Sequence, residues 1–493
     1  MSGAQRGAEP GSKPVAIGAA GGALVLVIAC VAQFMLVLDD TIVNVALPSI
    51  GGDLGLEEAS LSWVINAYLL TFGGFLLIGG RLADRFGAKR LFMLSLGGFA
   101  VASAICGAAP SSGVLIGARA AQGVTAALLS PAALALLLAS SPAGPERRRA
   151  LGIWAGLLGA GAVSGLLVGG ALVEFADWRW IFLVNLPVAG AALAVAQRVL
   201  PPDDRSRARR SPNIAGATLA TLALLSFVFT VVETDTHGWG SARTLAGFGL
   251  AALLAAAFVL SERRSDSPLV PPALLRRPQA ISADAVVFLA AGGLLAMFFF
   301  QTLYLQRVLG LSALETGAAF LPFSLSMGAV SVIAGRLGEA DPRFPIAGGL
   351  GLTALALWMM SALDPASGYV SAVLPSLALA GAGLGLALVP VIGLATGDAE
   401  ERDGGLASGL MTSCQQIGGA VGIAVMTTIA ASQTESALGS GLPVGQALSD
   451  GFSLAFRFEA AIMVVGILAA LALLGPRRGR RAGSEEIAAS AAA

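Results

Sequence analysis

The chain has 493 residues, of which 56% are hydrophobic and 12% charged, and its formal net charge is +0. The mean hydropathy of the chain is +0.81, which is too high for a protein whose surface faces water. This excludes an ordinary soluble domain and favours a protein surrounded by lipid. Because the charges balance, the chain has no basic excess that would indicate a nucleic-acid partner.

Apolar segments of about 20 residues recur along the chain, the length that a helix needs to cross about 30 Å of hydrocarbon. We predict an all-α membrane protein, because lipid offers no partner for unpaired backbone groups and a closed barrel would show alternating strands of about ten residues. There are fourteen predicted spans: Ala19 to Leu38, Leu61 to Gly80, Leu91 to Ala109, Val114 to Ser140, Leu151 to Val173, Trp180 to Leu200, Ile214 to Val232, Leu245 to Leu260, Ala280 to Leu303, Ala313 to Gly335, Ile346 to Leu363, Tyr369 to Thr396, Gly405 to Ala431 and Phe456 to Leu474.

Most of the 30 Lys and Arg residues lie in alternate gaps between these segments, and this identifies those gaps as cytoplasmic. The even number of spans then places both termini in the cytoplasm. No small-residue cleavage site follows the first segment, so we expect a retained span and not a signal peptide. The predicted order is an N-terminal tail (1–16), a six-helix bundle (17–200), a linker (201–212), two inserted helices (213–261), a linker (262–279), a second six-helix bundle (280–475) and a C-terminal tail (476–493).

A short internal repeat supports this division. Gly80-Arg81-Leu82 closes the second span of the first bundle, and Gly335-Arg336-Leu337 closes the second span of the second bundle. A duplicated bundle with a binding site between its halves, near the membrane midplane, is the layout of many secondary transporters.

Several motifs resemble those of the major facilitator superfamily and, within it, of the drug:proton antiporters with fourteen spans. The first span carries LDDTIVNVALP, in which Asp39, Thr41, Asn44 and Pro48 fall on that family's characteristic positions. GRLADRFGAKR, which begins at Gly80, is similar to the superfamily's loop between helices two and three. RAAQG from Arg119 and WRWIF from Trp178 extend the likeness. The resemblance implies a cell-membrane exporter that exchanges protons for drugs by alternating access.

A glycine-rich stretch resembles the fifth-helix motif of these antiporters through Gly161, Gly165, Gly169 and Gly170. Small residues let helix backbones approach closely, which fits either tight static packing or a sliding interface. Leu166 stands where the motif has a proline. A proline there would kink the helix by removing a backbone donor, so the sequence leaves the shape of this helix open.

A few charged residues fall inside the predicted spans, where each costs roughly 2.5 to 3.5 kcal/mol on insertion scales and therefore needs a function or a partner. Asp39 and Asp40 point about 100° apart on a helix, so only one can face a central cavity squarely, and the resemblance selects Asp39. A low-dielectric site favours the protonated carboxyl that a proton-coupled carrier requires. The alternative is a solvated pair at the outer membrane edge.

Two further charged residues are candidates. Arg119 lies about one and a half turns into the fourth span, and the resemblance ties it to proton coupling; the alternative is a hydrogen-bonding anchor between helices. Asp284 lies early in the ninth span and either binds substrate or protons or does no more than end its helix near the headgroups.

The loop after the second span is a candidate cytoplasmic gate. Its residues are Gly80, Arg81, Asp84, Arg85, Gly87, Lys89 and Arg90. Asp84 stands among four basic residues, so an ion-pair cluster could latch the cytoplasmic side in one conformation. The basic residues also serve as a topology signal, and the two functions are compatible.

Several kinds of chemistry are excluded. His237 is the only histidine and falls in a predicted outside loop, which excludes a histidine relay in the membrane, a Ser-His-Asp triad and a His/Cys metal site. No GxxxxGK[ST] sequence is present, so nothing supports ATP as the energy source. We expect no enzyme activity, metal or cofactor.

The favoured function is a multi-pass exporter of the bacterial inner membrane, with protons, membrane lipids and a small amphipathic or drug-like substrate as its partners. One alternative is an exporter of an endogenous metabolite such as an amino acid or a siderophore. The other is a membrane sensor or scaffold that transports nothing.

Overall fold

A computed structural model of the chain describes residues 19–56, 58–141, 145–200, 203, 213–266, 268–269, 278–336, 341–396 and 404–474, and all the regular secondary structure in these ranges is helical. The first part comprises α1 (Ala19–Leu54), α2 (Glu58–Leu61), α3 (Trp63–Phe86), α4 (Ala88–Gly107), α5 (Ser112–Ser140), α6 (Pro145–Phe175), α7 (Trp180–Leu183) and α8 (Asn185–Val199). The helices α9 (Ile214–His237) and α10 (Ala242–Arg264) follow. The last part comprises α12 (Pro278–Leu303), η2 (Tyr304–Val308), α13 (Ala313–Ala319), α14 (Leu321–Arg336), α15 (Arg343–Met360), η3 (Tyr369–Val373), α16 (Leu374–Thr396), α17 (Gly404–Gly439) and α18 (Val444–Leu473).

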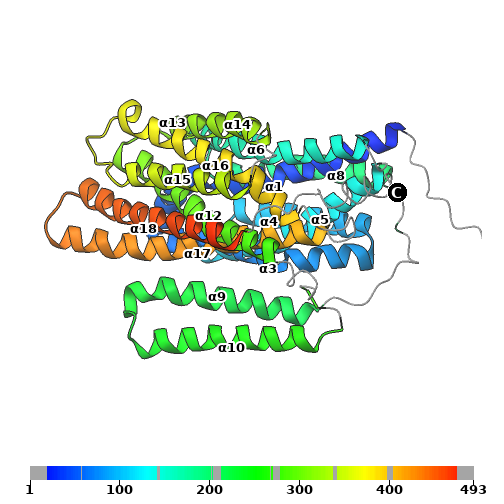
Figure 1. Ribbon diagram of the computed structural model, residues 1–493, viewed down its shortest axis with the longest axis horizontal. Helices are drawn as coiled ribbons and strands as arrows, with labels where there is room; N and C mark the ends of the chain where they lie inside the picture. Colours follow the sequence, from blue (N-terminus) through cyan, green and yellow to red (C-terminus); the bar gives the residue numbers. More distant parts are fainter. Residues whose placement is uncertain are drawn as a thin grey trace, which may run out of the picture.

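The predicted all-α membrane class is confirmed. Thirteen helices are long and apolar enough to cross a membrane, and α6 contributes a shorter apolar stretch, Val163–Phe175, among its described residues. Each of the fourteen predicted spans coincides with one of these helices or with a closely joined pair of them. Figure 1 shows the long helices running in roughly one direction, as expected when every span must cross the same hydrocarbon layer.

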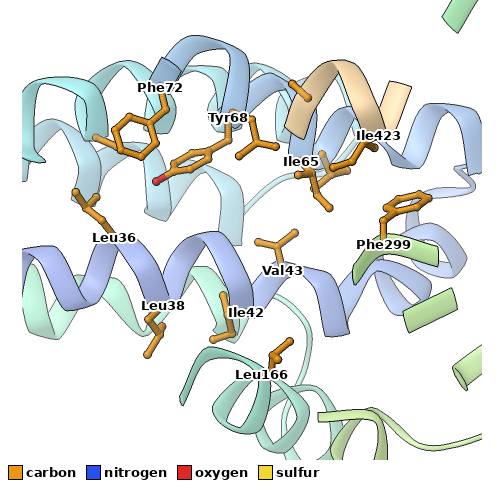
Figure 2. Packing of buried hydrophobic residues seen from close by; sticks show 14 of the residues in the cluster. Leu36, Leu38, Ile42, Val43, Ile65, Tyr68, Phe72, Leu166, Phe299 and Ile423 are labelled. Carbon is orange, nitrogen blue, oxygen red and sulfur yellow. The ribbon is translucent and has the colours of Figure 1, made fainter. Parts of the chain in front are cut away.

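The first six spans pack mainly on one another, and so do the last six. In the first part α3 packs on α5, α4 on α5, and α1 on α6; in the last part α12 packs on α17 and α18, and α15 on α16 and α18. The two parts meet where α3 contacts α17, α6 contacts α13 and α1 contacts α12. One apolar core continues across this boundary, with Val43 and Ile65 beside Phe299 and Ile423 (Figure 2).

The inserted pair lies on one flank of the bundle (Figure 1). Helix α9 contacts both α3 and α17, and α10 packs on the outer side of α9. The pair therefore touches both six-helix groups at their junction. The predicted tails and most of the two predicted linkers lie outside the described residues, so the division into bundles and linkers stays a prediction.

Several helices differ from their predicted spans, and three of the differences have a clear description. Helix α1 continues past Leu38 to Leu54, because the polar side chains that interrupt its apolar run are hydrogen-bonded within the protein. Helix α18 begins at Val444, twelve residues before the predicted Phe456. The tenth span is divided into α13 and α14 just before Pro322, whose missing N–H and ring interrupt the helix.

Candidate functional site

Asp39 lies in the middle of α1 and is fully buried. Its Oδ2 accepts a hydrogen bond from Nη1 of Arg119 at 2.6 Å. Its Oδ1 accepts from Nδ2 of Asn185 at 2.7 Å and from Nε2 of Gln122 at 3.2 Å. Asp39 therefore accepts hydrogen bonds from one positively charged group and from two amide groups.

Arg119 projects from α5 and is also fully buried. Its Nε donates to the backbone carbonyl of Val64 at 3.0 Å, and its Nη1 also donates to Oε1 of Gln122 at 2.9 Å. The guanidinium carbon lies 4.2 Å from the centre of the Tyr68 ring and 5.8 Å from that of Phe182, so aromatic faces add to its stabilisation. Arg119 therefore does not reach out to the membrane surface.

An outer set of polar groups orients the ion pair. Gln122 donates from Nε2 to the hydroxyl of Ser103 at 2.7 Å and accepts a weak bond from the Cys106 thiol at 3.2 Å. From the sequence alone, Gln122 is recognised only within the RAAQG motif, and none of Asn185, Ser103 and Tyr68 is assigned to the site. A polar residue buried in an apolar helix is a signal for such a role, but many helices here carry one.

Asp40 faces a different neighbour. It is only partly buried, and the side chain of Gln416 on α17 contacts its carboxyl group. All the hydrogen-bond partners of Asp39 lie within the first six spans, so its predicted place at a central cavity stays a prediction. The alternative of a solvated pair at the membrane edge does not fit a fully buried Asp39 or a helix that continues for about four turns beyond these residues.

The other residues of the first-helix motif hold its own backbone. Thr41 donates from Oγ1 to the carbonyl of Val37 at 3.0 Å, and Asn44 donates from Nδ2 to the carbonyl of Thr41 at 3.2 Å. Pro48 lies inside the helix one turn further on. These residues shape α1 without contacting the ion pair directly.

The glycines of α6 pack against the first-helix motif. A Cβ atom on Gly165 would lie 2.0 Å from Oγ1 of Thr41, and one on Gly169 would lie 2.7 Å from Cγ1 of Ile42. Gly161 is similarly tight, with Cβ of Val37 at 2.9 Å. The two motifs that are far apart in sequence are therefore in direct contact.

The last glycine of the motif contacts the other half. A Cβ on Gly170 would come within 2.6 Å of the carbonyl oxygen of Ala313, and one on Gly317 within 2.4 Å of the carbonyl oxygen of Leu166. Helix α6 passes through Leu166 as a continuous helix, and this residue is 4% exposed. Leu166 thus keeps the backbone regular where the family motif has a proline.

The predicted gate residues bind the segments that flank the inserted helices. Arg81 donates to the backbone carbonyls of Pro268 and Leu269, just after α10. The backbone N–H groups of Lys89 and Arg90 donate to the two carboxylate oxygens of Asp203, each at 3.0 Å, and the Lys89 ammonium contacts the carbonyl of Leu200.

The remaining gate residues have simpler surroundings. Gly87 has φ +94° and a Cβ there would overlap Cγ of Asp203 at 2.0 Å, so glycine is required. Gly80 faces Pro131, and Arg85 is exposed over the ring of Phe86. Asp84 lies in α3, but its side chain is outside the described residues, so the expected ion-pair cluster stays a prediction.

The second half holds two buried acids. Asp284, on α12, is 7% exposed, and its Oδ1 has no hydrogen-bond partner among the described residues. Glu459, on α18, is fully buried; sequence reasoning missed it because it lies close to the predicted start of its span. Neither acid joins the Asp39 cluster. In the described ranges no group of His, Cys, Asp and Glu is arranged to hold a metal ion.

Thirteen membrane-length helices surround an ion pair that is buried in one half, an arrangement that fits a secondary transporter. The chain belongs to the Major Facilitator Superfamily, whose sequence model matches residues 29–423. It is therefore a multi-pass protein of a bacterial membrane and not an enzyme.

Relatives cover most of the chain. The cephamycin export protein of Amycolatopsis lactamdurans is 41% identical over 92% of this chain and 93% of its own length. The puromycin resistance protein of Streptomyces alboniger is 38% identical over 92% of this chain and 91% of its own length. The tetracenomycin C resistance and export protein of Streptomyces glaucescens is 36% identical over 83% of this chain and 76% of its own length.

Solved structures agree on the fold. A bacterial homologue of the human lysosomal transporter Spinster, in an inward-facing and unoccupied conformation, has a TM-score of 0.66 at 17% identity, covering 93% of this chain and 98% of that chain. An auto-inhibited peptide transporter of the POT family has a TM-score of 0.66 at 15% identity, covering 94% and 97%.

Proposed function

We propose that this protein exports small amphipathic, drug-like molecules from the cell in exchange for protons. The observation that carries the proton coupling is the fully buried pair of Asp39 and Arg119, joined at 2.6 Å. The relatives named for puromycin resistance, cephamycin export and tetracenomycin C export support the class of substrate.

The ion pair works as a proton exchanger. When Asp39 is paired with Arg119 it is a carboxylate, and its proton has been released. Protonation of Asp39 removes the charge that holds Arg119 and leaves a cation buried among Tyr68, Gln122 and the carbonyl of Val64. Because an unpaired buried cation is costly, protonation drives a rearrangement of α1 against α5.

Helix α1 transmits this rearrangement to the boundary between the halves. Asp40 is next to Asp39 and meets Gln416 of α17, and Thr41 is packed under Gly165 of α6. A shift of α1 at Asp39 therefore moves its contacts with both neighbours. This connection supports a mechanism in which the charge state of Asp39 selects the orientation of the halves.

The contacts between the halves favour one orientation in this conformation. Gln306 donates from Nε2 to the carbonyl of Val45 at 2.9 Å, and α6 meets α13 at Gly170 and Gly317. These contacts lie towards the helix ends remote from the Arg-rich loop after α3. If that loop is cytoplasmic, as the distribution of basic residues predicts, the halves are closed on the outside, the termini face the cytoplasm, and substrate enters from inside or from the inner leaflet.

We further propose that the loop from Gly80 to Arg90 gates the cytoplasmic side. Its anchors are Asp203 before α9 and the carbonyls of Pro268 and Leu269 after α10. The segments before α9 and after α10 therefore both bind the loop that we propose as the gate. ATP has no part in this mechanism.

Everted membrane vesicles test the proposal. We expect them to accumulate puromycin, a cephamycin or tetracenomycin C when an inward-acidic pH gradient is imposed without ATP. We also expect accumulation to stop when an ionophore collapses that gradient. Vesicles that accumulate none of the three compounds, or that do so only with ATP, would contradict the proposal.

A further inference from the structure

Glu459 is a carboxyl group buried in the second half without any partner. Its side chain has 0% exposure, and neither Oε1 nor Oε2 has a hydrogen-bond partner among the described residues. Asp39, equally buried, accepts three hydrogen bonds and pairs with a guanidinium group. The two acids therefore experience opposite environments.

The surroundings of Glu459 are apolar. It shares one face of α18 with Phe452, Phe456 and Met463, because residues three and four apart align on a helix. This face meets α12, where Phe300 lies 5.5 Å from Phe452 and 6.3 Å from Phe456 between ring centres. Gly293 lies about two turns before Phe300 on α12. A Cβ atom on Gly293 would come within 2.4 Å of the Met463 methyl group and 3.8 Å of Cβ of Glu459.

No cation among the described residues pairs with this carboxyl group. The elements packed against α18 are α12, η2, α15 and α17, and their charged and titratable side chains are Asp284, Tyr304, Arg307, Arg343, Cys414 and Glu435. On α18 itself these are Asp450 and the exposed Arg457. Among the described residues none of these groups forms a hydrogen bond or an ion pair with the carboxyl group of Glu459.

Glu459 and Asn185 share a short spacing in sequence. Asn185 follows Phe182 by three residues in the last span of the first half, and Glu459 follows Phe456 by three in the last span of the second. Asn185 binds the carboxylate of Asp39. At this spacing the first half carries an amide that binds an acid, and the second half carries an acid.

We propose that Glu459 is a second proton-binding site, which holds a proton in this conformation and releases it during the transport cycle. An unpaired carboxylate in such surroundings is strongly disfavoured, whereas a neutral carboxyl group fits among Phe456, Met463 and Gly293. In this conformation the first half is then unprotonated at Asp39 and the second half protonated at Glu459. The release of the proton rests on the proposed proton-coupled export, whereas the binding of a proton by Glu459 in this conformation does not depend on it.

Infrared spectroscopy of the purified full-length protein in lipid nanodiscs tests for the bound proton. At neutral pH the wild type is expected to show the carbonyl stretch of a protonated carboxyl group that Glu459→Gln lacks and Glu459→Asp retains. The matched control is Glu435→Gln, which changes an exposed acid on α17 and should leave that band unchanged. Identical carbonyl bands in the wild type and Glu459→Gln would overturn the proposal, whether or not the protein transports puromycin.

Proteoliposomes test the release of the proton. With the membrane potential clamped at zero and protein-free liposomes subtracted, a gradient of about one pH unit can support about 100-fold accumulation of puromycin for two coupled protons and about 10-fold for one. We expect Glu459→Gln to reduce the maximal accumulation ratio of puromycin about tenfold. An unchanged ratio, or complete loss of gradient-driven accumulation, would overturn the release step. If the Gln variant is not monodisperse, Glu459→Met removes the same proton with an apolar side chain.

Absence of gradient-driven transport of puromycin, a cephamycin and tetracenomycin C by the wild type would instead refute the proposed function. The infrared result would still decide whether Glu459 holds a proton.

Discussion

Replacing Asp39 by asparagine should destabilise the protein strongly, because it leaves Arg119 as a buried cation without a counter-charge. The pair has 0% exposure on both sides and a 2.6 Å contact. Removing one partner of such a pair costs about 3–5 kcal/mol. The introduced amide would also direct its own N–H groups at one of the donors from Asn185, Gln122 or Arg119, which adds to the cost.

The double variant Asp39→Asn with Arg119→Gln separates lost charge from lost packing. It removes both charges together, so we expect it to be more stable than Asp39→Asn alone, with a coupling free energy of about 2 kcal/mol or more. The free energy of unfolding can be measured by titration with SDS in mixed micelles, followed by tryptophan fluorescence.

Asp53→Asn is the matched control on the same helix. Asp53 pairs with Arg179 at 2.9 Å near the protein surface, where the side chains are 46% and 33% exposed, so its loss should cost less than about 1 kcal/mol. The reasoning is refuted if Asp39→Asn costs no more than Asp53→Asn, or if the double variant loses the sum of the two single effects.

Three further substitutions probe other contacts. Gly317→Val should force α13 away from the Leu166 carbonyl, which lies 2.4 Å from the position of a Cβ, and so increase the α6 to α13 distance measured by spin labels. Asp203→Ala should cost about 0.5–2 kcal/mol of unfolding free energy, because it removes both acceptors for the first N–H groups of α4. Leu269→Ala should weaken the small cluster with Ile78 and Ala217 by about 2–5 kcal/mol and speed hydrogen exchange in α9.

Each of these has an internal control. Gly328→Val places the same side chain in open space on α14 and should leave the spin-label distance unchanged. Asp203→Asn keeps one acceptor and should lose about half as much stability as the alanine variant. Exchange in α15, which is remote from the Leu269 cluster, should not respond to Leu269→Ala. Equal responses in test and control would refute the corresponding contact.

The number and kind of helices could be predicted from the sequence, because the hydrophobic thickness of a membrane fixes the length of every span. The ends of α1 and α18 could not. Hydropathy treats Asp39 and Asn44 as interruptions, whereas the hydrogen bonds of Asp39 to other helices and of Asn44 to the backbone of α1 make both compatible with a buried helix.

The candidate site could be predicted only in part. The sequence identified Asp39 and Arg119 as charges that need partners, and the resemblance tied both to proton coupling without naming either as the other's partner. Helix geometry alone could not decide which of Asp39 and Asp40 faces a central cavity, because the rotation of α1 depends on its packing on α6, and only the resemblance selected Asp39. Glu459 was missed because it lies close to the predicted start of its span at Phe456, whereas the helix begins at Val444 and buries this residue.

Proton movement on substrate addition tests the central claim most directly. Internal pH is followed in everted vesicles, acidified beforehand, that contain the wild type, Asp39→Asn or Asp53→Asn, while puromycin is added. The account predicts release of protons from vesicles with the wild type and Asp53→Asn, and none with Asp39→Asn. Equal proton release with Asp39→Asn would contradict the account, because exchange would then proceed without the acid that pairs with Arg119.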